Sequence, residues 1–430
     1  MEPTIEETKK KNRNLLIIFK MLSYDFLFFY TISYLFMANV KGLSASQIVF
    51  GEAFYPMFKI FLQIPCTFIV QKLGKKKSLL IANISLLIYM LIIIGLINTL
   101  SLIIANIFCA FGYVIKGMCE STLIYDSIDN GENKRELFSK YEGRANAAYY
   151  FVDAITAILA GFLFAINPYI PLVLSSIVII ISICVAHNLV DINKVEETKE
   201  ISVLKQLRNY FNDVKVSTKF IFRSERLKAL ILYDSLLVAL LTITVNLRTS
   251  LLNELHVSSQ NFGLIFSVMG LISCIAATRA LKIHLKHKNK TLSLIGITYT
   301  ISIFICSLVV FLHFPKFLMY YIILIMFSIQ YFDRGSFQTI IKQYFNSFCD
   351  SKMRLKIYST SILIESLTTT TLSIICSLIL KVFSASTTIL LVGTFSSIAI
   401  ILILKYMSSR IGLKPEEYPE KDIDYSDLLQ

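Results

Sequence analysis

The sequence predicts an all-α integral membrane protein with twelve transmembrane helices, arranged as two halves of six. Three observations predict this fold class. Apolar residues make up 55% of the 430 residues and charged residues only 17%, too few to cover a water-exposed surface. The apolar residues gather in stretches of about 20 residues, the length that crosses the hydrocarbon core of a bilayer. Basic residues gather in every second connection between these stretches.

Six apolar stretches of spanning length form each half. The first six lie at 15–38, 47–70, 78–98, 101–125, 145–166 and 170–190. The second six lie at 228–251, 259–281, 291–313, 317–340, 357–380 and 385–407. The predicted regions are therefore an N-terminal segment, a six-helix bundle, a linker, a second six-helix bundle and a tail, at 1–14, 15–190, 191–227, 228–407 and 408–430.

Lys and Arg predict the orientation of the chain. The N-terminus, the connections after helices 2, 4, 6, 8 and 10, and the C-terminus, together with Lys228 and Lys405 at the adjoining helix ends, hold 33 of the 42 basic residues. The other connections hold only Lys41, Lys316 and Lys381. Because basic residues collect in cytoplasmic loops, both termini are predicted to be cytoplasmic, in a protein of the cell membrane. The net charge of +13 follows from this topology, so no nucleic-acid partner is predicted.

The linker at 191–227 has apolar residues at helical spacing among basic ones, from Val203 to Val214. This pattern predicts an amphipathic helix on the inner membrane surface, and a solvated tether between the halves is the alternative. The eight cysteines form no C-x-x-C pair, and His284 and His287 are interpreted as solvated, so no metal site is predicted. Neither G-x-x-x-x-G-K-[ST] nor G-x-G-x-x-G occurs, which leaves an ion gradient or the substrate's own gradient as the energy source, and no cofactor.

The segment from Gln63 to Leu79, QIPCTFIVQKLGKKKSL, carries a recognisable motif. It resembles the E-I-P-T-G-x-x-A-D-R-x-G-R-K-K-S-L segment found after helix 2 in bacterial members of the major facilitator superfamily of secondary transporters. The residues in register, or with conserved charge, include Pro65, Gly74, Lys75 and Lys76. Gln71 replaces the motif's Asp, which makes a salt bridge in that loop of the family.

Two further segments resemble the same family. LIYDSI and KYEGR, between Leu123 and Arg144, are similar to the end of helix 4 and the loop after it. RLKIYSTSILIESL, from Arg354, is similar to the start of helix 11. The G-P-x-x-G-G signature of drug antiporters is absent from helix 5, where Gly161 stands alone. The two halves match the parallel repeat of this family, whose binding site lies at the interface of the repeats.

Ionisable residues inside the predicted spans are candidate site residues, because such groups are costly in a bilayer and usually face the bundle interior. Asp25 and Lys116 each lie ten residues from the end of their stretch, about 15 Å deep, and Lys59 lies at a similar depth. Lys116 and Glu120 share one helix face. The resemblance implies that helices 1, 4, 7 and 10 line the cavity, which places Asp25 and Lys116 on facing walls. The remaining pathway candidates are Asp234, Asp333, Arg334 and Glu365.

The sequence-based hypothesis is a transporter that works by alternating access, not an enzyme, and that expels an amphipathic compound or peptide against protons. Asp25 and Glu120 are the predicted proton carriers, and Asp234 with Arg334 a predicted inner gate. By resemblance, Asp126 and Arg144 form an inner latch with the loop residues Lys75 to Lys77; solvated loop charges are the alternative. Efflux is favoured by aromatic residues of the cavity helices, namely Tyr24, Phe28, Phe29, Tyr30, Tyr113, Phe327 and Tyr331.

Three alternatives remain at this stage. The first is a nutrient or metabolite importer in which Lys116 and Arg334 pair with an anionic substrate. The second is a membrane sensor or partner protein that carries no flux, suggested by Gln71. In the third, the charges inside the spans only fasten helices together. The expected partners are the lipid bilayer and a small-molecule substrate, and we expect a monomer.

Overall fold

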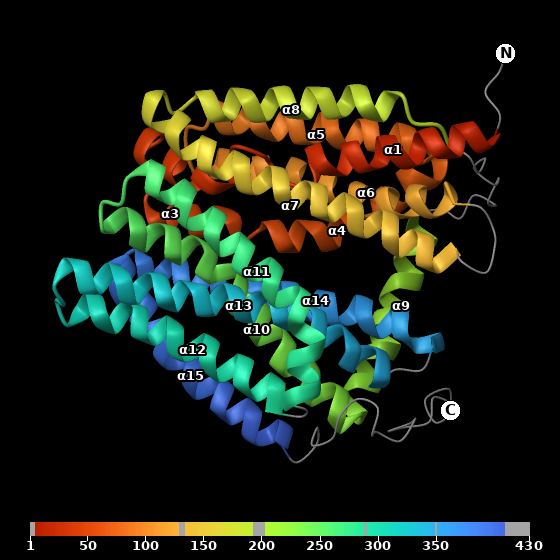
Figure 1. The fold of residues 1–430 in the computed structure, drawn as a ribbon. Helices are drawn as coiled ribbons and strands as arrows, with labels where there is room; N and C mark the ends of the chain where they lie inside the picture. Colours follow the sequence, from red (N-terminus) through yellow and green to blue (C-terminus); the bar gives the residue numbers. More distant parts are fainter. Residues whose placement is uncertain (1–4, 129–133, 192–202, 288–289, 349–350, 409–430) are drawn as a thin grey trace. The chain divides into compact units, whose positions relative to one another are not determined.

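The computed structural model describes residues 5–128, 134–191, 203–287, 290–348 and 351–408, and regular structure in these ranges is entirely helical (Figure 1). The chain divides into two compact units. Unit 1 holds residues 1–207 and 256–267, and unit 2 holds residues 208–255 and 268–430. Most of the predicted tail and the first part of the predicted linker lie outside the described residues.

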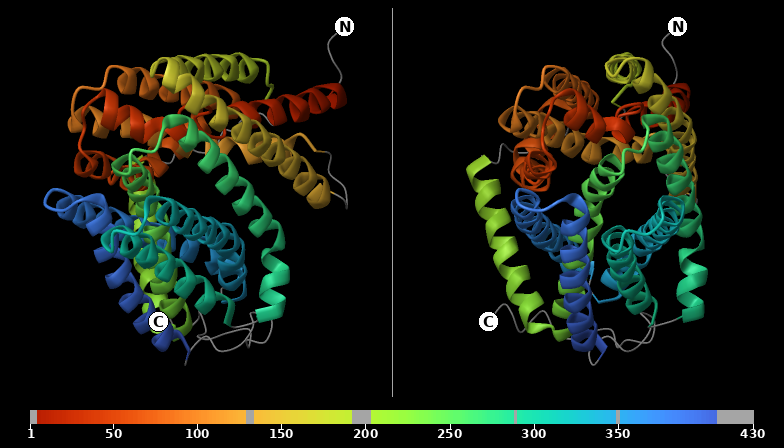
Figure 2. Two further views of the ribbon diagram at one scale, coloured as in Figure 1. Left: turned by 60° about the vertical axis from the view of Figure 1, so that its left-hand side comes forward. Right: turned by 90° about the vertical axis from the view of Figure 1, so that its left-hand side faces the viewer.

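Unit 1 begins with α1 (Ile5–Ser23), followed by the short elements η1 (Tyr30–Ile32), α2 (Ser33–Leu35) and η2 (Phe36–Val40). Its longer helices are α3 (Ala45–Glu52), α4 (Tyr55–Leu73), α5 (Lys75–Ile94), α6 (Thr99–Asp126), α7 (Lys134–Ile166) and α8 (Ile170–His187). In this unit α5 packs along both α6 and α8, and α1 packs against α7 and α8 (Figures 1 and 2).

Unit 2 holds α10 (Glu225–Glu254), α12 (Lys290–Phe311), α13 (Lys316–Phe348), α14 (Ser351–Leu380) and α15 (Ala385–Ser408). The division between the units falls within α9 (Val203–Arg223) and within α11 (Ser259–His287). In unit 2, α12 packs along α13 and α15, and α10 packs along α14 and α15. The helix α9 covers most of the linker segment for which the sequence predicts an amphipathic helix.

Local sequence explains where several helices begin. Ser44 and Gln47 form a capping box before α3, and Asn98 and Ser101 form another before α6, which satisfies amide groups that have no partner within the helix. Gly74 separates α4 from α5 with a φ of 83°, a backbone conformation that favours glycine. The motif residue Pro65 lies within α4.

Eleven helices within the described ranges are long and apolar enough to cross a membrane. They correspond to eleven of the twelve predicted stretches. The exception is the stretch at 15–38, for which the sequence predicts one continuous helix. That expectation is wrong, because α1 ends at Ser23 and helical structure resumes only at Tyr30.

The interruption lies between two apolar clusters of unit 1. Leu16 and Phe19 of α1 belong to one cluster, together with Cys66, Ile115 and other buried residues. Phe26, Phe29 and Ile32 belong to the other. Phe28, within the interruption, has a φ of 67°, a left-handed conformation that is rare for a bulky residue. Buried apolar side chains thus anchor the first span before the non-helical segment Tyr24–Phe29 as well as within and after it.

Candidate functional site

Asp25 lies in the interruption of the first span. Its carboxylate Oδ1 accepts a 2.8 Å hydrogen bond from the backbone N–H of Phe26 and a 3.0 Å hydrogen bond from the hydroxyl of Tyr113 on α6. An Asp side chain that bonds to a neighbouring backbone N–H competes with helix formation, which accounts for the local loss of helix. In a bilayer, non-helical backbone is tolerated only where it is buried in protein or lines a water-filled cavity.

Lys116 and Glu120 lie on α6, about one and two helical turns after Tyr113. The ammonium Nζ of Lys116 lies 3.6 Å from Glu120 Oε1, and the two side chains are 3% and 10% exposed. The same ammonium lies 5.0 Å from the centre of the Tyr113 ring and 5.9 Å from that of Phe19. The ring of Tyr113 therefore lies beside the Lys116 ammonium, while its hydroxyl bonds to Asp25.

A second ion pair, which is partly buried, joins α1 to α7. Lys20 forms an ion pair with Glu142, whose Oε1 also accepts a 3.2 Å hydrogen bond from Ser121 of α6. Lys20 lies within the predicted span at 15–38, but neither Lys20 nor Glu142 was predicted as a site residue. The available signal was the KYEGR segment, in which Glu142 lies two residues before the latch candidate Arg144.

Together these groups form a polar series within unit 1. Asp25 and Tyr113 lie at the interruption, Lys116 and Glu120 follow along α6, and the pair of Lys20 and Glu142 adjoins Ser121, the residue after Glu120. Acidic and basic groups alternate along this series, so each charge has an opposite charge in its vicinity. Such an arrangement can hold ions or protons at membrane depth, where an isolated charge is costly.

Three tyrosines adjoin the interruption. The ring of Tyr24 lies 4.5 Å from that of Tyr149 and 6.4 Å from that of Tyr150, measured between centroids. Tyr24 and Tyr150 remain 40% and 47% exposed, so they present aromatic surface beside Asp25. The other candidate on this unit, Lys59 of α4, is exposed, with its ammonium 5.6 Å from the centre of the Tyr55 ring.

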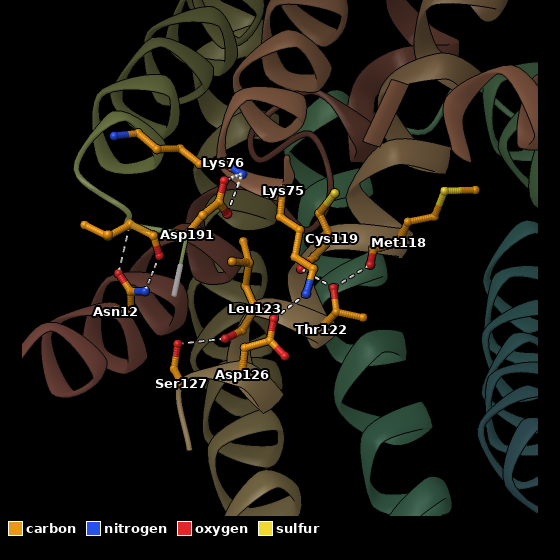
Figure 3. A network of polar contacts seen from close by, with 11 residues as sticks. Asn12, Lys75, Lys76, Met118, Cys119, Thr122, Leu123, Asp126, Ser127 and Asp191 are labelled. Atoms are coloured by element: carbon orange, nitrogen blue, oxygen red, sulfur yellow. Dashed lines mark hydrogen bonds and ion pairs between the residues drawn. The ribbon is translucent and has the colours of Figure 1, made fainter. Parts of the chain in front are cut away.

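The loop motif forms a contact network at the start of α5 (Figure 3). Lys75 forms an ion pair with Asp126 at the end of α6. The carboxylate of Asp191 accepts the backbone N–H of Lys76, at 3.1 and 3.3 Å, and so caps the N-terminus of α5. Beside it, Asn12 and Val190 exchange two hydrogen bonds, of 2.7 and 3.1 Å. Gln71 and Arg144 are exposed, on α4 and α7.

In unit 2, two carboxyl groups meet. The buried side chain of Asp234 on α10 hydrogen-bonds with Glu365 and Ser361 on α14, and Ser361 donates a 2.9 Å bond to Glu365. Asp333 of α13 accepts a 2.8 Å hydrogen bond from the hydroxyl of Thr298. Arg334, the next residue, is half-buried. The structure thus brings Asp234 beside Glu365, and the gate predicted between Asp234 and Arg334 stays a prediction.

The family model described as Major Facilitator Superfamily matches residues 13–359 of this sequence. The chain belongs to the major facilitator superfamily. It is therefore a secondary transporter of the membrane, with the multi-pass helical fold of that family and no enzymatic role. No curated protein matches the sequence.

Solved structures of the superfamily share the fold. The nucleoside transporter NupG matches with a TM-score of 0.68 and 12% identity over 93% of this chain and 98% of that one. A POT family transporter in complex with 5-aminolevulinic acid matches with a TM-score of 0.68 and 11% identity, over 94% and 96%. A D-xylose-proton symporter matches with a TM-score of 0.65 and 12% identity, over 94% and 98%. At these identities the similarity shows the fold alone.

Proposed function

We propose that this superfamily member couples the movement of its substrate to protons and that Asp25 is the proton carrier. The observation that supports this most is the position of the Asp25 carboxylate in a non-helical segment of the first span, bonded to Tyr113. Interrupted membrane helices that place a titratable group at membrane depth are a recurrent feature of transporter sites. Asp25 exchanges its proton as the site opens to each side in turn.

The polar series along α6 gives that proton a path. From Asp25 it passes Lys116 and Glu120 and reaches Lys20 and Glu142, toward the end of the unit that the distribution of basic residues predicts to be cytoplasmic. Glu120 is the second proton carrier in this scheme. Lys116 lies 3.6 Å from Glu120, so the affinity of Glu120 for a proton changes whenever Lys116 moves.

We further propose that the substrate is an amphipathic compound or peptide that the protein expels. The exposed rings of Tyr24 and Tyr150 beside Asp25 support an apolar or aromatic part in the substrate, because such rings stack readily on aromatic groups. The second candidate is import. It is favoured by the structural neighbours, whose descriptions name a nucleoside transporter and a D-xylose-proton symporter.

The remaining elements of the proposal follow from the loop network and the charge distribution. The ion pair of Lys75 with Asp126 and the cap of Asp191 on α5 form an inner latch that is rearranged when the site changes access. Both termini lie in the cytoplasm, and the protein acts as a monomer in the cell membrane.

Proteoliposomes test the proposal directly. Two probes are offered across an imposed pH step: the dipeptide alanyl-phenylalanine, an amphipathic zwitterion, and ethidium, an amphipathic cation. The intact protein should move a probe faster with the proton gradient than without it, and Asp25→Asn should lose this acceleration while remaining folded. Arg279→Gln, on an exposed position of α11, is the control and should behave as the unchanged protein. A proton effect that persists in Asp25→Asn would exclude Asp25 as the carrier.

Direction is tested with cells that overproduce the protein. Lower retention of the transported probe than in cells without the protein indicates efflux, and higher retention indicates import. If the protein binds a probe but moves neither probe across the liposome membrane, the alternative of a sensor that carries no flux is favoured.

A further inference from the structure

Unit 2 contains a buried arginine that none of the proposed functions uses. Arg248 lies on α10, six residues before the end of that helix at Glu254, which corresponds to about 9 Å along the helix axis. It is only 3% exposed. The distribution of basic residues predicts that this end of α10 is extracytoplasmic.

The surroundings of Arg248 fix the plane and one end of its guanidinium group. The terminal nitrogen Nη1 donates a 2.9 Å hydrogen bond to Gln330 Oε1 on α13 and lies 3.5 Å from Thr244 Oγ1, one turn earlier on α10. The Tyr331 ring lies 4.7 Å from the guanidinium carbon, measured to the ring centroid. Thr244 is held in turn by a 2.5 Å hydrogen bond with the hydroxyl of Tyr299.

The other edge of the guanidinium group, formed by Nε and Nη2, has no hydrogen-bond partner among the described residues and is called the open edge below. Both nitrogens are buried. No carboxylate in the described part of the chain forms an ion pair with Arg248. Nε and Nη2 carry the two parallel N–H groups that arginine presents side-on to a planar anion. A buried guanidinium with this edge unpaired is costly, unless a ligand provides the negative charge in another state of the transport cycle.

We propose that the open edge of Arg248 binds a carboxylate group of the transported compound. Two parallel N–H groups match the two oxygens of a carboxylate, and one negative charge balances the single buried positive charge. A phosphate would bring about 1.5 to 2 negative charges at neutral pH, more than the single charge of Arg248 balances. A chloride ion is a single atom, so it does not match the two parallel N–H groups of Nε and Nη2 as the two carboxylate oxygens do.

Gln330, Thr244 and Tyr331 are positioning residues in this scheme. They occupy Nη1 and one face of the guanidinium, so the only edge left for a ligand is the one formed by Nε and Nη2. A lysine at position 248 would keep the charge but would present a single rotating ammonium group in place of the rigid fork. The substitution Arg248→Lys therefore separates carboxylate recognition from charge balance.

This inference rests on the function proposed above, but the binding of a carboxylate can be measured without transport. The full-length protein is purified in detergent, and its thermal unfolding is followed with a thiol-reactive fluorogenic dye, which reports the exposure of buried cysteines such as Cys66, Cys306 and Cys376. Sodium formate, sodium phosphate and sodium chloride are titrated at equal ionic strength. Formate should raise the unfolding temperature with saturation, because a ligand that binds the folded state stabilises it. Phosphate and chloride should not.

Variants identify the site of this effect. Arg248→Lys should weaken the apparent formate affinity by roughly tenfold or more, because a bidentate charge-assisted contact is lost, and Arg248→Met should abolish the saturation. Gln330→Leu should weaken it less. Arg279→Lys, on an exposed position of α11, should leave it unchanged.

Three outcomes would overturn the proposal: no saturable effect of formate on the unchanged protein, an equal effect in Arg248→Lys, or stabilisation by phosphate or chloride that matches that of formate. Titration of the unchanged protein alone decides the first and the third of these outcomes, so the test remains valid even if Arg248→Met does not fold. Asp25→Asn should retain the formate effect. Loss of proton coupling and loss of carboxylate binding are therefore separate results.

Discussion

The hydroxyl of Tyr113 donates a 3.0 Å hydrogen bond to the carboxylate of Asp25, and this contact connects α6 to the interruption of the first span. The same carboxylate oxygen accepts the N–H of Phe26 at 2.8 Å. One side chain therefore both ends a helix and contacts the neighbouring helix. Any change in the charge of Asp25 alters two contacts at once, which is the physical basis for its proposed role.

Removing the hydroxyl of Tyr113 should weaken proton coupling without abolishing it. Tyr113→Phe keeps the ring beside the Lys116 ammonium but deletes one hydrogen bond to a carboxylate, an interaction of about 1.5–3 kcal/mol. We expect the proton-driven component of flux to fall by about tenfold or more. Flux in proteoliposomes at several pH values measures this. Tyr320→Phe, which deletes a hydroxyl that donates a 2.7 Å hydrogen bond to the backbone oxygen of Leu255 in unit 2, is a comparison of the same chemistry elsewhere.

Breaking the pair of Lys116 and Glu120 should destabilise the protein more than removing it altogether. Both side chains are buried, so Lys116→Met leaves the Glu120 carboxylate without its nearest ammonium, a change that typically costs about 3–5 kcal/mol. The double variant Lys116→Met with Glu120→Gln removes the uncompensated charge and should recover much of that loss. Thermal unfolding of the three proteins gives the comparison. Equal destabilisation by the single and the double change would contradict this account.

The ion pair of Lys75 with Asp126 should contribute modestly to stability. The two side chains are 31% and 15% exposed, so solvent screens their attraction, and a coupling energy of up to about 1 kcal/mol is expected. A double-mutant cycle with Lys75→Met and Asp126→Asn measures it from unfolding temperatures. A larger effect on transport rate than on stability would fit a latch that opens during the cycle.

Close helix packing at Gly335 should be sensitive to a single methyl group. A Cβ on Gly335 of α13 would lie 2.9 Å from Ser273 Oγ on α11 and closer still to the carbonyl oxygen of Ser273. Gly335→Ala should therefore destabilise unit 2, by about 1–3 kcal/mol. Gly270→Ala on the same α11 meets nothing within 4 Å and should be neutral or stabilising, by up to about 1 kcal/mol. Thermal unfolding of both variants measures the difference.

The contact of Asp234 with Glu365 requires a hydrogen-bond donor on one of the two carboxyl groups. Glu365→Gln supplies that donor from its amide and should lie within about 1 kcal/mol of the unchanged protein. Glu365→Ala removes the partner of Asp234 and of Ser361 and should cost about 1–3 kcal/mol. Similar unfolding temperatures for the two variants would show that this contact contributes little.

Much of the fold can be predicted from the sequence because each helix must cross the hydrocarbon core of a bilayer. A span needs about 20 apolar residues, and basic residues avoid the outer side, so run length and charge together predict eleven of the spanning helices at nearly their observed positions. The interruption at Tyr24–Phe29 escapes such reasoning. The segment contains neither Pro nor Gly and is strongly apolar, and only the bond from Phe26 to the Asp25 side chain shows why helix formation fails there.

The candidate site was predictable in its residue types but not in its pairing. Lys116 and Glu120 are neighbours on one helix, so their spacing alone predicts that they meet. Lys20 and Glu142 are separated by 122 positions, and Arg248 and Gln330 by 82. Such partners depend on how the helices pack within each unit, and one sequence does not contain that information. Asp191, which caps α5 from beyond α8, was missed for the same reason.

The interruption in the first span also has a mechanical consequence. A continuous helix behaves as a rod, so that a tilt at one end displaces the other end by a comparable amount. Here the rod is divided, since α1 ends at Ser23 and the part from Tyr30 to Val40 is built from three short elements. The two parts can reorient separately about Tyr24–Phe29. Asp25 lies at this joint, so a movement of either part changes the surroundings of its carboxylate.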